Sequence, residues 1–228
     1  LEVMGRNAGW LTAATAIAAY KGHGPDLIYL PEIDFDLDRF MADVRAVYER
    51  EKKCIVAISE GLKTADGRYI PELVGEVSRD AFGHAQMGGA GAILANHVKE
   101  TLGCKVRAIE FSLLQRCAAH CGSQTDVDEA VLAGRTAVLA ALAGTTDRMV
   151  GFRRQEGTEY RCDVDLLPLT VVANAEKKIP REWINAEGNF VTDDYIRYAL
   201  PLIQGESSPP MEEGVPRFAR LRKVSAAR

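Results

Sequence analysis

The stretch Cys54-Ile-Val-Ala-Ile-Ser-Glu-Gly61 decides the fold of this chain. Its apolar residues run continuously instead of alternating with polar ones, which is typical of a strand buried on both faces of a parallel sheet. A second continuous run, Asp26-Leu-Ile-Tyr-Leu-Pro31, lies upstream, and helical patterns at 10–20 and 36–53 precede the two runs. Asp36 is placed to cap the second of these helices. This alternation of helices and strands predicts an α/β fold with a doubly wound, mostly parallel sheet.

Length and composition are those of an ordinary globular protein. The 228 residues are 47% hydrophobic and 26% charged, and the net charge of -4 argues against a general nucleic-acid or membrane surface. No apolar run approaches the ~20 residues that span a bilayer. The five cysteines are an odd number and widely spread, which does not suggest a disulfide framework. We therefore expect a cytoplasmic protein without nucleic-acid or membrane partners.

The segment Met4-Gly5-Arg6-Asn7-Ala8-Gly9 leads from a short strand pattern into the first helical pattern. Its glycines let the backbone pass close to a ligand, and the N–H groups that open a helix favour an anion. Arg6 adds a planar cation suited to phosphate or carboxylate. Taken alone, the segment is better explained as a tight strand-to-helix turn with a solvated arginine.

Glu60 follows directly on the central apolar run, so it is predicted at the carboxyl end of a strand. Ligands of open parallel sheets bind at that edge. A carboxylate there can accept hydrogen bonds from sugar hydroxyls, although a surface loop acid is the alternative interpretation.

Residues 105–116 alternate in polarity and predict a strand that ends in Gln115 and Arg116. Arg6, Arg107 and Arg116 would then all lie at or near strand ends. A doubly charged phosphate that is bound without a metal usually needs more than one arginine.

The run Cys117-Ala-Ala-His-Cys121 offers soft metal ligands. A structural zinc needs four ligands, and the sequence has no second Cys/His cluster. We therefore interpret these cysteines as reduced packing residues and predict no metal site. His84 and His97 are interpreted as a loop residue and a helix-surface residue.

The chain is divided at residue 116 into an α/β domain, 1–116, and a second part, 117–228, that holds a long helix, a hairpin and a basic tail. The first part opens at Leu1 inside a strand pattern, so we expect it to be incomplete at its N-terminus. The further predicted elements are a helix at 92–102, a long helix over 130–143 with Thr125 as its N-cap, a hairpin of 149–154 with 160–164, and short helices at 180–184 and 192–199.

Taken together and in order, these motifs resemble the phosphofructokinase family. The segments that carry the resemblance are Met4-Gly5-Arg6, Ala57-Ile-Ser-Glu-Gly61, and Arg107 followed nine residues later by Arg116. Two further segments are similar in sequence to members of the pyrophosphate-dependent branch. They are Phe82-Gly-His-Ala-Gln-Met-Gly-Gly-Ala90 and Leu114-Gln-Arg-Cys-Ala-Ala-His-Cys121. The resemblance runs over nearly the whole chain.

The resemblance implies a sugar-phosphate site in this chain. In that family the Met-Gly-Arg segment, here Met4, Gly5 and Arg6, holds fructose 6-phosphate. The strand-end glutamate, here Glu60, takes sugar hydroxyls, and the arginine that matches Arg116 binds the 6-phosphate.

Two positions qualify this picture. Arg107 matches an arginine that reaches into the sugar site of a neighbouring subunit, which implies a homo-oligomer, either a dimer or a tetramer. Leu113 stands where relatives carry His or Tyr, so a compensating phosphate contact is expected from elsewhere.

The family's phosphoryl-donor segment, Gly-Gly-Asp, and its catalytic segment, Thr-Ile-Asp-Asn-Asp, precede Met-Gly-Arg, and neither string occurs here. The resemblance therefore implies that this chain supplies the sugar-phosphate site and no catalytic residue. The absent half would hold most of the Mg²⁺ contacts, and residues after Arg116 would partly pack on it.

The resemblance implies transfer of a phosphoryl group from pyrophosphate to the C1 hydroxyl of fructose 6-phosphate, with ATP as the alternative donor. The chain alone is expected to be inactive. Two other interpretations stay open: a sugar-phosphate-binding or regulatory module without catalysis, and a generic α/β domain whose arginines lie on its surface.

Overall fold

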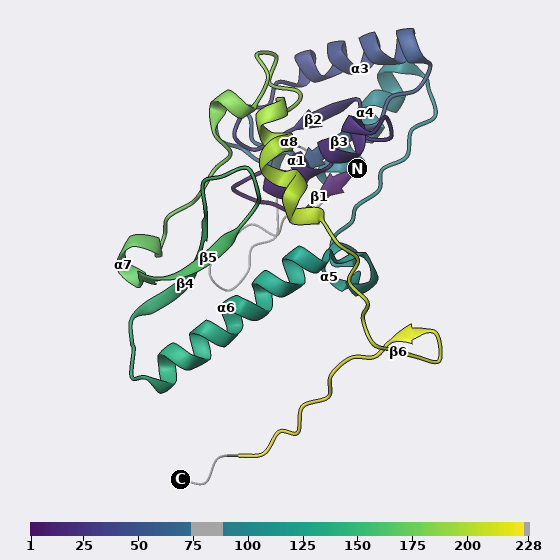
Figure 1. Ribbon diagram of the computed structural model, residues 1–228. Helices are drawn as coiled ribbons and strands as arrows, with labels where there is room; N and C mark the ends of the chain where they lie inside the picture. The colour runs from purple at the N-terminus through teal and green to yellow at the C-terminus, as the bar shows by residue number, and fades with distance from the viewer. Residues whose placement is uncertain (74–88, 226–228) are drawn as a thin grey trace.

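The computed structural model describes residues 1–73 and 89–225, and a three-stranded parallel sheet lies at its centre. Strand β3 (Val56–Ser59) is the middle strand, with β1 (Glu2–Val3) on one side and β2 (Leu27–Tyr29) on the other. Ile58 is the common partner, since it pairs with Glu2 of β1 and with Tyr29 of β2. Figure 1 shows the sheet in the upper part of the molecule. The predicted α/β fold with a parallel sheet is confirmed.

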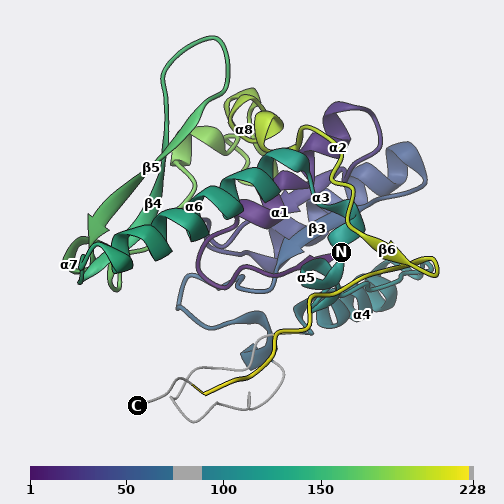
Figure 2. The same ribbon diagram turned by 60° about the horizontal axis from the view of Figure 1, so that its bottom comes forward.

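Helices cover both faces of this sheet (Figures 1 and 2). One face packs against α1 (Trp10–Ala14), α2 (Ala16–Tyr20) and α8 (Asp193–Ala199), and the other against α3 (Leu37–Glu51) and α4 (Ala90–Leu102). Strand side chains alternate between the two cores as the pleat requires. The first core contains Ile28, Leu30 and Ala57, and the second contains Leu27, Tyr29 and Ile58.

Helix α3 begins where its sequence signal predicts. The side chain of Asp36 accepts a hydrogen bond from the backbone N–H of Arg39 at 2.8 Å, so the predicted N-cap is confirmed. Lys52 adopts a left-handed φ of 59° and ends the helix.

The prediction of a strand that ends at Arg116 is wrong. In the described chain this segment pairs only at Glu110, which forms an isolated parallel bridge with Glu2. Ser112 then turns the backbone to a φ of 42°, which no extended strand can hold. The short helix α5 (Leu114–Cys117) follows, so Arg116 lies in a helix and not at a strand end.

The long helix α6 (Gln124–Leu142) packs beside an antiparallel hairpin of β4 (Arg148–Arg154) and β5 (Cys162–Pro168), which α7 (Leu169–Val172) follows (Figure 2). The hairpin confirms the prediction, with Gly151 opposite Asp165.

The cap of α6 differs from the prediction. The Oγ atom of Ser123, not the side chain of Thr125, accepts the N–H of Asp126 at 3.2 Å. Thr125 instead donates its hydroxyl to the carbonyl of Gln204 at 3.1 Å. The helix thus begins two residues earlier than the capping pattern indicated.

After the hairpin the chain returns to the sheet through η3 (Arg181–Trp183), α8 and η4 (Leu200–Ile203). The hydroxyl of Tyr195, a residue only 2% exposed, donates to the carbonyl of Trp10 at 2.6 Å. The Trp10 ring lies 6.2 Å from Trp183 and 5.3 Å from Tyr198. Residues 179–199 therefore share one core with α1 and β2.

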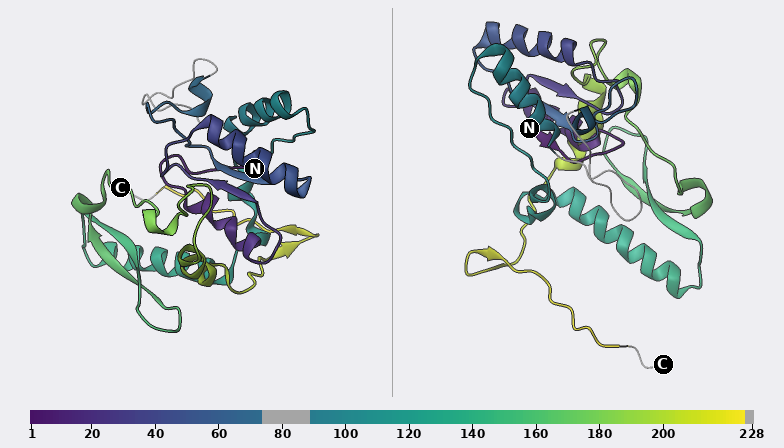
Figure 3. Two further views of the ribbon diagram at one scale, coloured as in Figure 1. Left: turned by 90° about the horizontal axis from the view of Figure 1, so that it is seen from above. Right: turned by 180° about the vertical axis from the view of Figure 1, so that it is seen from behind.

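Beyond residue 203 the chain forms a small hairpin of β6 (Met211–Glu212) and β7 (Val215–Pro216) and an extended tail. The tail runs away from the rest of the molecule (Figures 1 and 3). Its apolar side chains are exposed, among them Phe218, Leu221 and Val224.

Candidate functional site

The Met4-Gly5-Arg6 turn lies at the carboxyl end of β1, beside the carboxyl end of β3. The backbone N–H of Gly5 donates to Oε1 of Glu60 at 3.0 Å. Gly5 has a φ of 146°, and a Cβ added there would lie 2.8 Å from the carbonyl oxygen of Ala8. Two sequence-predicted segments are therefore in direct contact, because neighbouring parallel strands end at the same edge of a sheet.

Two residues that flank Glu60 shape the turn, and the sequence analysis missed both. Ser59 is fully buried, and its hydroxyl donates to the carbonyl of Gly5. A Cβ added to Gly61 would lie only 1.8 Å from the carbonyl oxygen of Arg6. Gly61 is thus needed for the close approach of the two backbones. The signal was present in the sequence, since both residues adjoin a predicted site residue.

Helix α5 joins the same turn. The backbone N–H of Met4 donates to Oε1 of Gln115 at 3.0 Å, across 111 residues of sequence. This bond places α5, and with it Arg116, next to the turn that carries Arg6. Leu113, at the N-cap of α5, is 65% exposed.

The start of α1 already has an internal carboxylate partner. The N–H of Gly9 donates to both carboxylate oxygens of Glu32, at 2.9 and 3.2 Å, and the N–H of Ile179 donates to Oε1 at 3.0 Å. Glu32 therefore occupies part of the positive end of α1, where the sequence predicts a ligand anion. A ligand anion near Arg6 must rely mainly on side chains.

Arg107 is not brought to the Met4-Gly5-Arg6 turn. It lines a cavity of about 640 Å³ between α3, α4 and the segment 104–108, together with Lys52, Lys53 and Lys105. None of the other predicted site residues is among the described residues that line this cavity.

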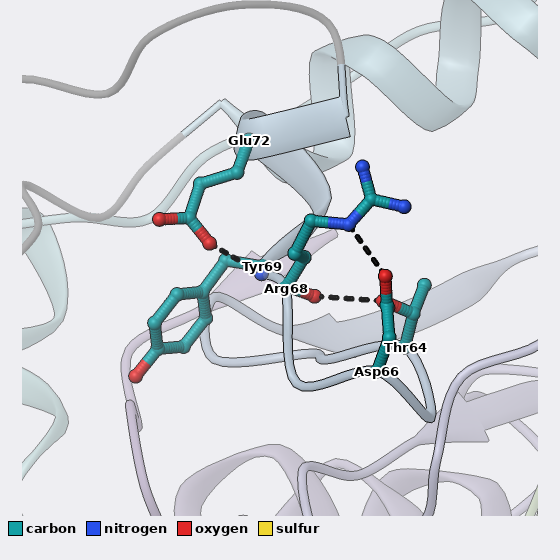
Figure 4. Close-up of polar contacts among 5 residues, drawn as sticks. All are labelled: Thr64, Asp66, Arg68, Tyr69 and Glu72. Atoms are coloured by element: carbon teal, nitrogen blue, oxygen red, sulfur yellow. Dashed lines mark hydrogen bonds and ion pairs between the residues drawn. The ribbon is translucent and has the colours of Figure 1, made fainter.

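The loop that follows Glu60 is tied by its own polar contacts, which Figure 4 shows. Thr64 donates to the carbonyl of Arg68 at 3.1 Å, and Nε of Arg68 donates to Asp66 at 2.6 Å. The N–H of Tyr69 donates to Glu72 at 2.8 Å, at the start of η1 (Ile70–Leu73). These bonds hold the chain where it leaves the turn.

The remaining sequence predictions concern the histidines, the cysteines, metal binding and membrane-spanning helices. His84 and most of the motif at 82–90 lie outside the described residues. Cys117 and Cys121 are exposed, so the interpretation as packing residues is wrong. The described residues contain no group of three or more His, Cys, Asp or Glu side chains that could hold a metal ion. Within the same residues, no helix combines the length and apolar character that crossing a membrane requires.

Comparisons with known proteins agree with this geometry. Residues 1–121 match the family described as Phosphofructokinase. Proteins named pyrophosphate–fructose 6-phosphate 1-phosphotransferase are similar: that of Halomonas elongata is 42% identical over 98% of this chain, and that of Methylococcus capsulatus 41% identical over 99%. The chain spans about half of these relatives, 53% of each.

A solved structure is similar along the whole chain. The pyrophosphate-dependent phosphofructokinase from Marinobacter aquaeolei superposes with a TM-score of 0.83 at 36% identity, over 100% of this chain and 53% of that one. The family match covers more than half of the sequence, and the solved structure superposes on the whole chain. This chain belongs to the phosphofructokinase family.

Proposed function

We propose that this chain supplies the sugar-phosphate side of a pyrophosphate-dependent 6-phosphofructokinase. The reaction would move a phosphoryl group from pyrophosphate to the C1 hydroxyl of fructose 6-phosphate and yield fructose 1,6-bisphosphate. The observation that carries this proposal is the convergence of the Met4-Gly5-Arg6 turn, Glu60 and α5 at one edge of the sheet. The names of the full-length relatives support the choice of substrate and donor.

In this proposal Glu60 and the arginines have separate tasks. Oε1 of Glu60 is held by the N–H of Gly5, so the carboxylate is oriented and its second oxygen can accept a sugar hydroxyl. Arg6 and Arg116, on two elements joined by Gln115, bind the 6-phosphate through charge-assisted hydrogen bonds. Fixing both ends of the sugar directs the C1 hydroxyl toward the donor, and alignment of this kind is a large part of catalysis in phosphoryl transfer.

The described residues do not supply the other groups that phosphoryl transfer needs. We infer that the catalytic base and the donor contacts come from other parts of the enzyme. When bound, Mg²⁺ would neutralise charge on the transferring phosphoryl group. The described residues offer no cluster that could hold it by themselves.

We further propose a cytoplasmic homo-oligomer, a dimer or tetramer, in which Arg107 serves the site of a neighbouring subunit. Its place on the cavity between α3 and α4, away from the Met4-Gly5-Arg6 turn, supports this assignment. We also keep the division at residue 116 as a proposal, with 117–228 partly packing against the rest of the enzyme and 179–199 returning to the core of the first part.

The test is the substitution Arg116→Ala in the active enzyme. Loss of a charge-assisted bond to the phosphate should cost ~2 kcal/mol or more, which is roughly a thirtyfold loss of affinity for fructose 6-phosphate. Arg135→Ala, an exposed arginine on α6, is the matched control and should leave the affinity unchanged.

The affinity is read from KM with saturating donor and from calorimetric titration of the sugar phosphate. Pyrophosphate and ATP are assayed separately, so that the donor is decided in the same experiment. An Arg116→Ala enzyme with unchanged affinity would show that the phosphate assignment is wrong.

A further inference from the structure

A buried carboxyl group lies directly behind the proposed site. Glu2 is only 3% exposed and is the first residue of β1, two residues before the Met4-Gly5-Arg6 turn. Its Oε2 accepts the N–H of Gly91, in the first turn of α4, at 2.7 Å. Its Oε1 is also buried and has no hydrogen-bond partner among the described residues. An ionised carboxylate with one bare oxygen would be costly in such a place.

A second carboxyl group stands beside it. Glu110 is the direct partner of Glu2 in an isolated parallel bridge, so the two side chains leave the sheet on the same face. Like charges that lie directly opposite each other on adjacent strands repel. A cation between them is disfavoured, because the positive end of α4 already faces Glu2. A single proton removes the repulsion without adding a second positive charge.

We propose that Glu2 carries a proton in the folded chain, opposite the carboxylate of Glu110, and that this proton positions Arg116 beside the Met4-Gly5-Arg6 turn. Neither residue touches the substrate in this proposal. Both are positioning residues that act through the segment between Glu110 and Arg116. Only this last step, the effect on substrate binding, rests on the proposed function.

The backbone provides the connection to Arg116. The N–H of Glu2 donates to the carbonyl of Ile109 at 2.8 Å, and the N–H of Phe111 donates back to the carbonyl of Glu2 at 3.0 Å. The N–H of Arg116 donates to the carbonyl of Leu113 at 3.0 Å, within the turn that begins α5. Repulsion between two ionised carboxylates would push this segment away from β1 and carry α5 with it.

The charges around Glu2 agree in direction. Burial raises the pKa of Glu2, and the nearby carboxylates of Glu110 and Glu60 raise that pKa further, against the opposing bond from Gly91. The backbone nitrogen of Leu1 donates to the carbonyl of Val56 at 2.7 Å. The first turn of α4 carries no acidic residue. Because the pKa is raised on folding, stability is present at acid pH and is lost as the pH rises through the folded pKa of Glu2.

The first measurement is the pH dependence of unfolding in the whole chain, with four proteins compared. Wild type should lose unfolding free energy as the pH rises from acid to neutral. Glu2→Gln, which keeps the shape and the acceptor for Gly91, should abolish this loss. Glu110→Gln should lower the midpoint of the loss and make the loss smaller. Glu100→Gln, an exposed residue of α4, is the control and should behave as wild type.

Infrared spectra recorded across the same pH range provide an independent readout. Wild type and Glu100→Gln should keep the carbonyl stretch of a protonated carboxyl group at a pH where exposed carboxyl groups have lost theirs, and Glu2→Gln should not. Protonation of Glu2 is overturned if that band survives Glu2→Gln, and the influence of Glu110 is overturned if Glu110→Gln leaves the midpoint unchanged. Because Glu110 is exposed, its variant tests the pair even if substitution of Glu2 impairs folding.

The second measurement is KM for fructose 6-phosphate against pH in the active enzyme. KM of wild type should rise through the same pH window, and KM of Glu2→Gln should not. The phosphate of the substrate itself titrates at about pH 6. Its titration is the same for every variant, so its effect on KM cancels when the variants are compared. Identical pH profiles of KM would overturn the positioning role. Failure of the wild type to use the sugar phosphate would overturn the proposed function, while the stability profiles would still decide the proton.

Discussion

At Gly61 two stretches of backbone pass so closely that no side chain fits between them. One is the start of the loop after β3, and the other is the turn that carries Arg6. Ser59 and Glu60, which precede Gly61, hold Gly5 from both its carbonyl and its N–H. The geometry of the proposed site is therefore set by small residues next to the residues that would touch a ligand.

We expect Gly61→Ala to displace the turn, because its new Cβ would lie 1.8 Å from the carbonyl oxygen of Arg6. The variant should lose affinity for fructose 6-phosphate and unfold at a lower temperature. Gly134→Ala is the matched control, because no atom lies within 4 Å of a Cβ added there, on an exposed face of α6. That control should gain about 0.5–1 kcal/mol. Equal melting temperatures for the two variants would contradict this account.

The thiols should differ in reactivity. Burial, with smaller effects of Asp26 and Cys104, raises the pKa of Cys54 to about 11, so little thiolate exists there at neutral pH. Cys117 and Cys121 are exposed. We expect iodoacetamide to modify these two first, and the rate at Cys54 to climb as the pH approaches its pKa. Mass spectrometry of timed digests measures this order, and early modification of Cys54 would refute it.

At this scale the sequence allowed prediction of residues that follow a strand, and little else. Glu60 and the Met4-Gly5-Arg6 turn meet because adjacent parallel strands end together. Gln115 reaches Met4 across 111 residues, and no local pattern reports such a contact. Glu32 was missed for the same reason, since its partners Gly9 and Ile179 are distant in the chain.

Among the elements, α3 and α6 differ in how well their sequences predicted their starts. For α3, Asp36 was predicted as the N-cap from the sequence, and the structure confirms it. The start of α6 offers both Ser123 and Thr125. Ser123 is the residue that caps the helix. Its hydroxyl also donates to the carbonyl of Leu202 at 2.6 Å, a tertiary contact that the local sequence cannot reveal.

Removal of the α3 cap should have a measurable cost. Asp36→Ala deletes the bond to the N–H of Arg39 and should lower the free energy of unfolding by about 1 kcal/mol. Asp38→Ala removes the same charge from the same helix turn without removing the cap. It should cost less, about 0.3–1 kcal/mol from the helix dipole alone. Urea denaturation of both variants measures the difference, and an equal cost would argue against the cap.

The predicted strand before Arg116 failed for a reason that belongs to this scale. An alternating pattern indicates a strand only when a neighbour can pair along its length, and the described structure pairs this segment at Glu110 alone. Ser112 then turns the chain into α5. The central strand β3, with a neighbour on each side, was predicted correctly from its continuous apolar run.

For the whole molecule, the distribution of apolar surface on α6 is unusual. Its half-buried positions include the small residues Ala133, Thr136 and Ala140, whereas larger side chains point to solvent. The exposed apolar residues of this helix are Val127, Val131, Leu132, Val138, Leu139 and Leu142, the last 80% exposed. An exposed apolar face of this kind marks a contact surface. It supports the proposal that this region packs against the rest of the enzyme.

We expect the separate chain to self-associate through this face. Val138→Lys together with Leu142→Lys should shift it toward monomer in sedimentation velocity, because the added charges interrupt the apolar stripe. Ala137→Lys with Ala141→Lys adds the same charge to neighbouring exposed positions of the helix outside the stripe, and should have a smaller effect. An unchanged sedimentation coefficient in the first variant would show that another surface drives association.

The two tryptophans of the chain both belong to the aromatic cluster that joins α1 to the returning segment 179–199. Trp10 opens the helix directly after the Met4-Gly5-Arg6 turn, and Lys177 lies over its ring at 6.0 Å. The tryptophan emission of the chain therefore comes from one cluster, which lies a few residues from Arg6. A fluorimeter alone, without any label, can thus follow ligand binding at that turn and the docking of segment 179–199.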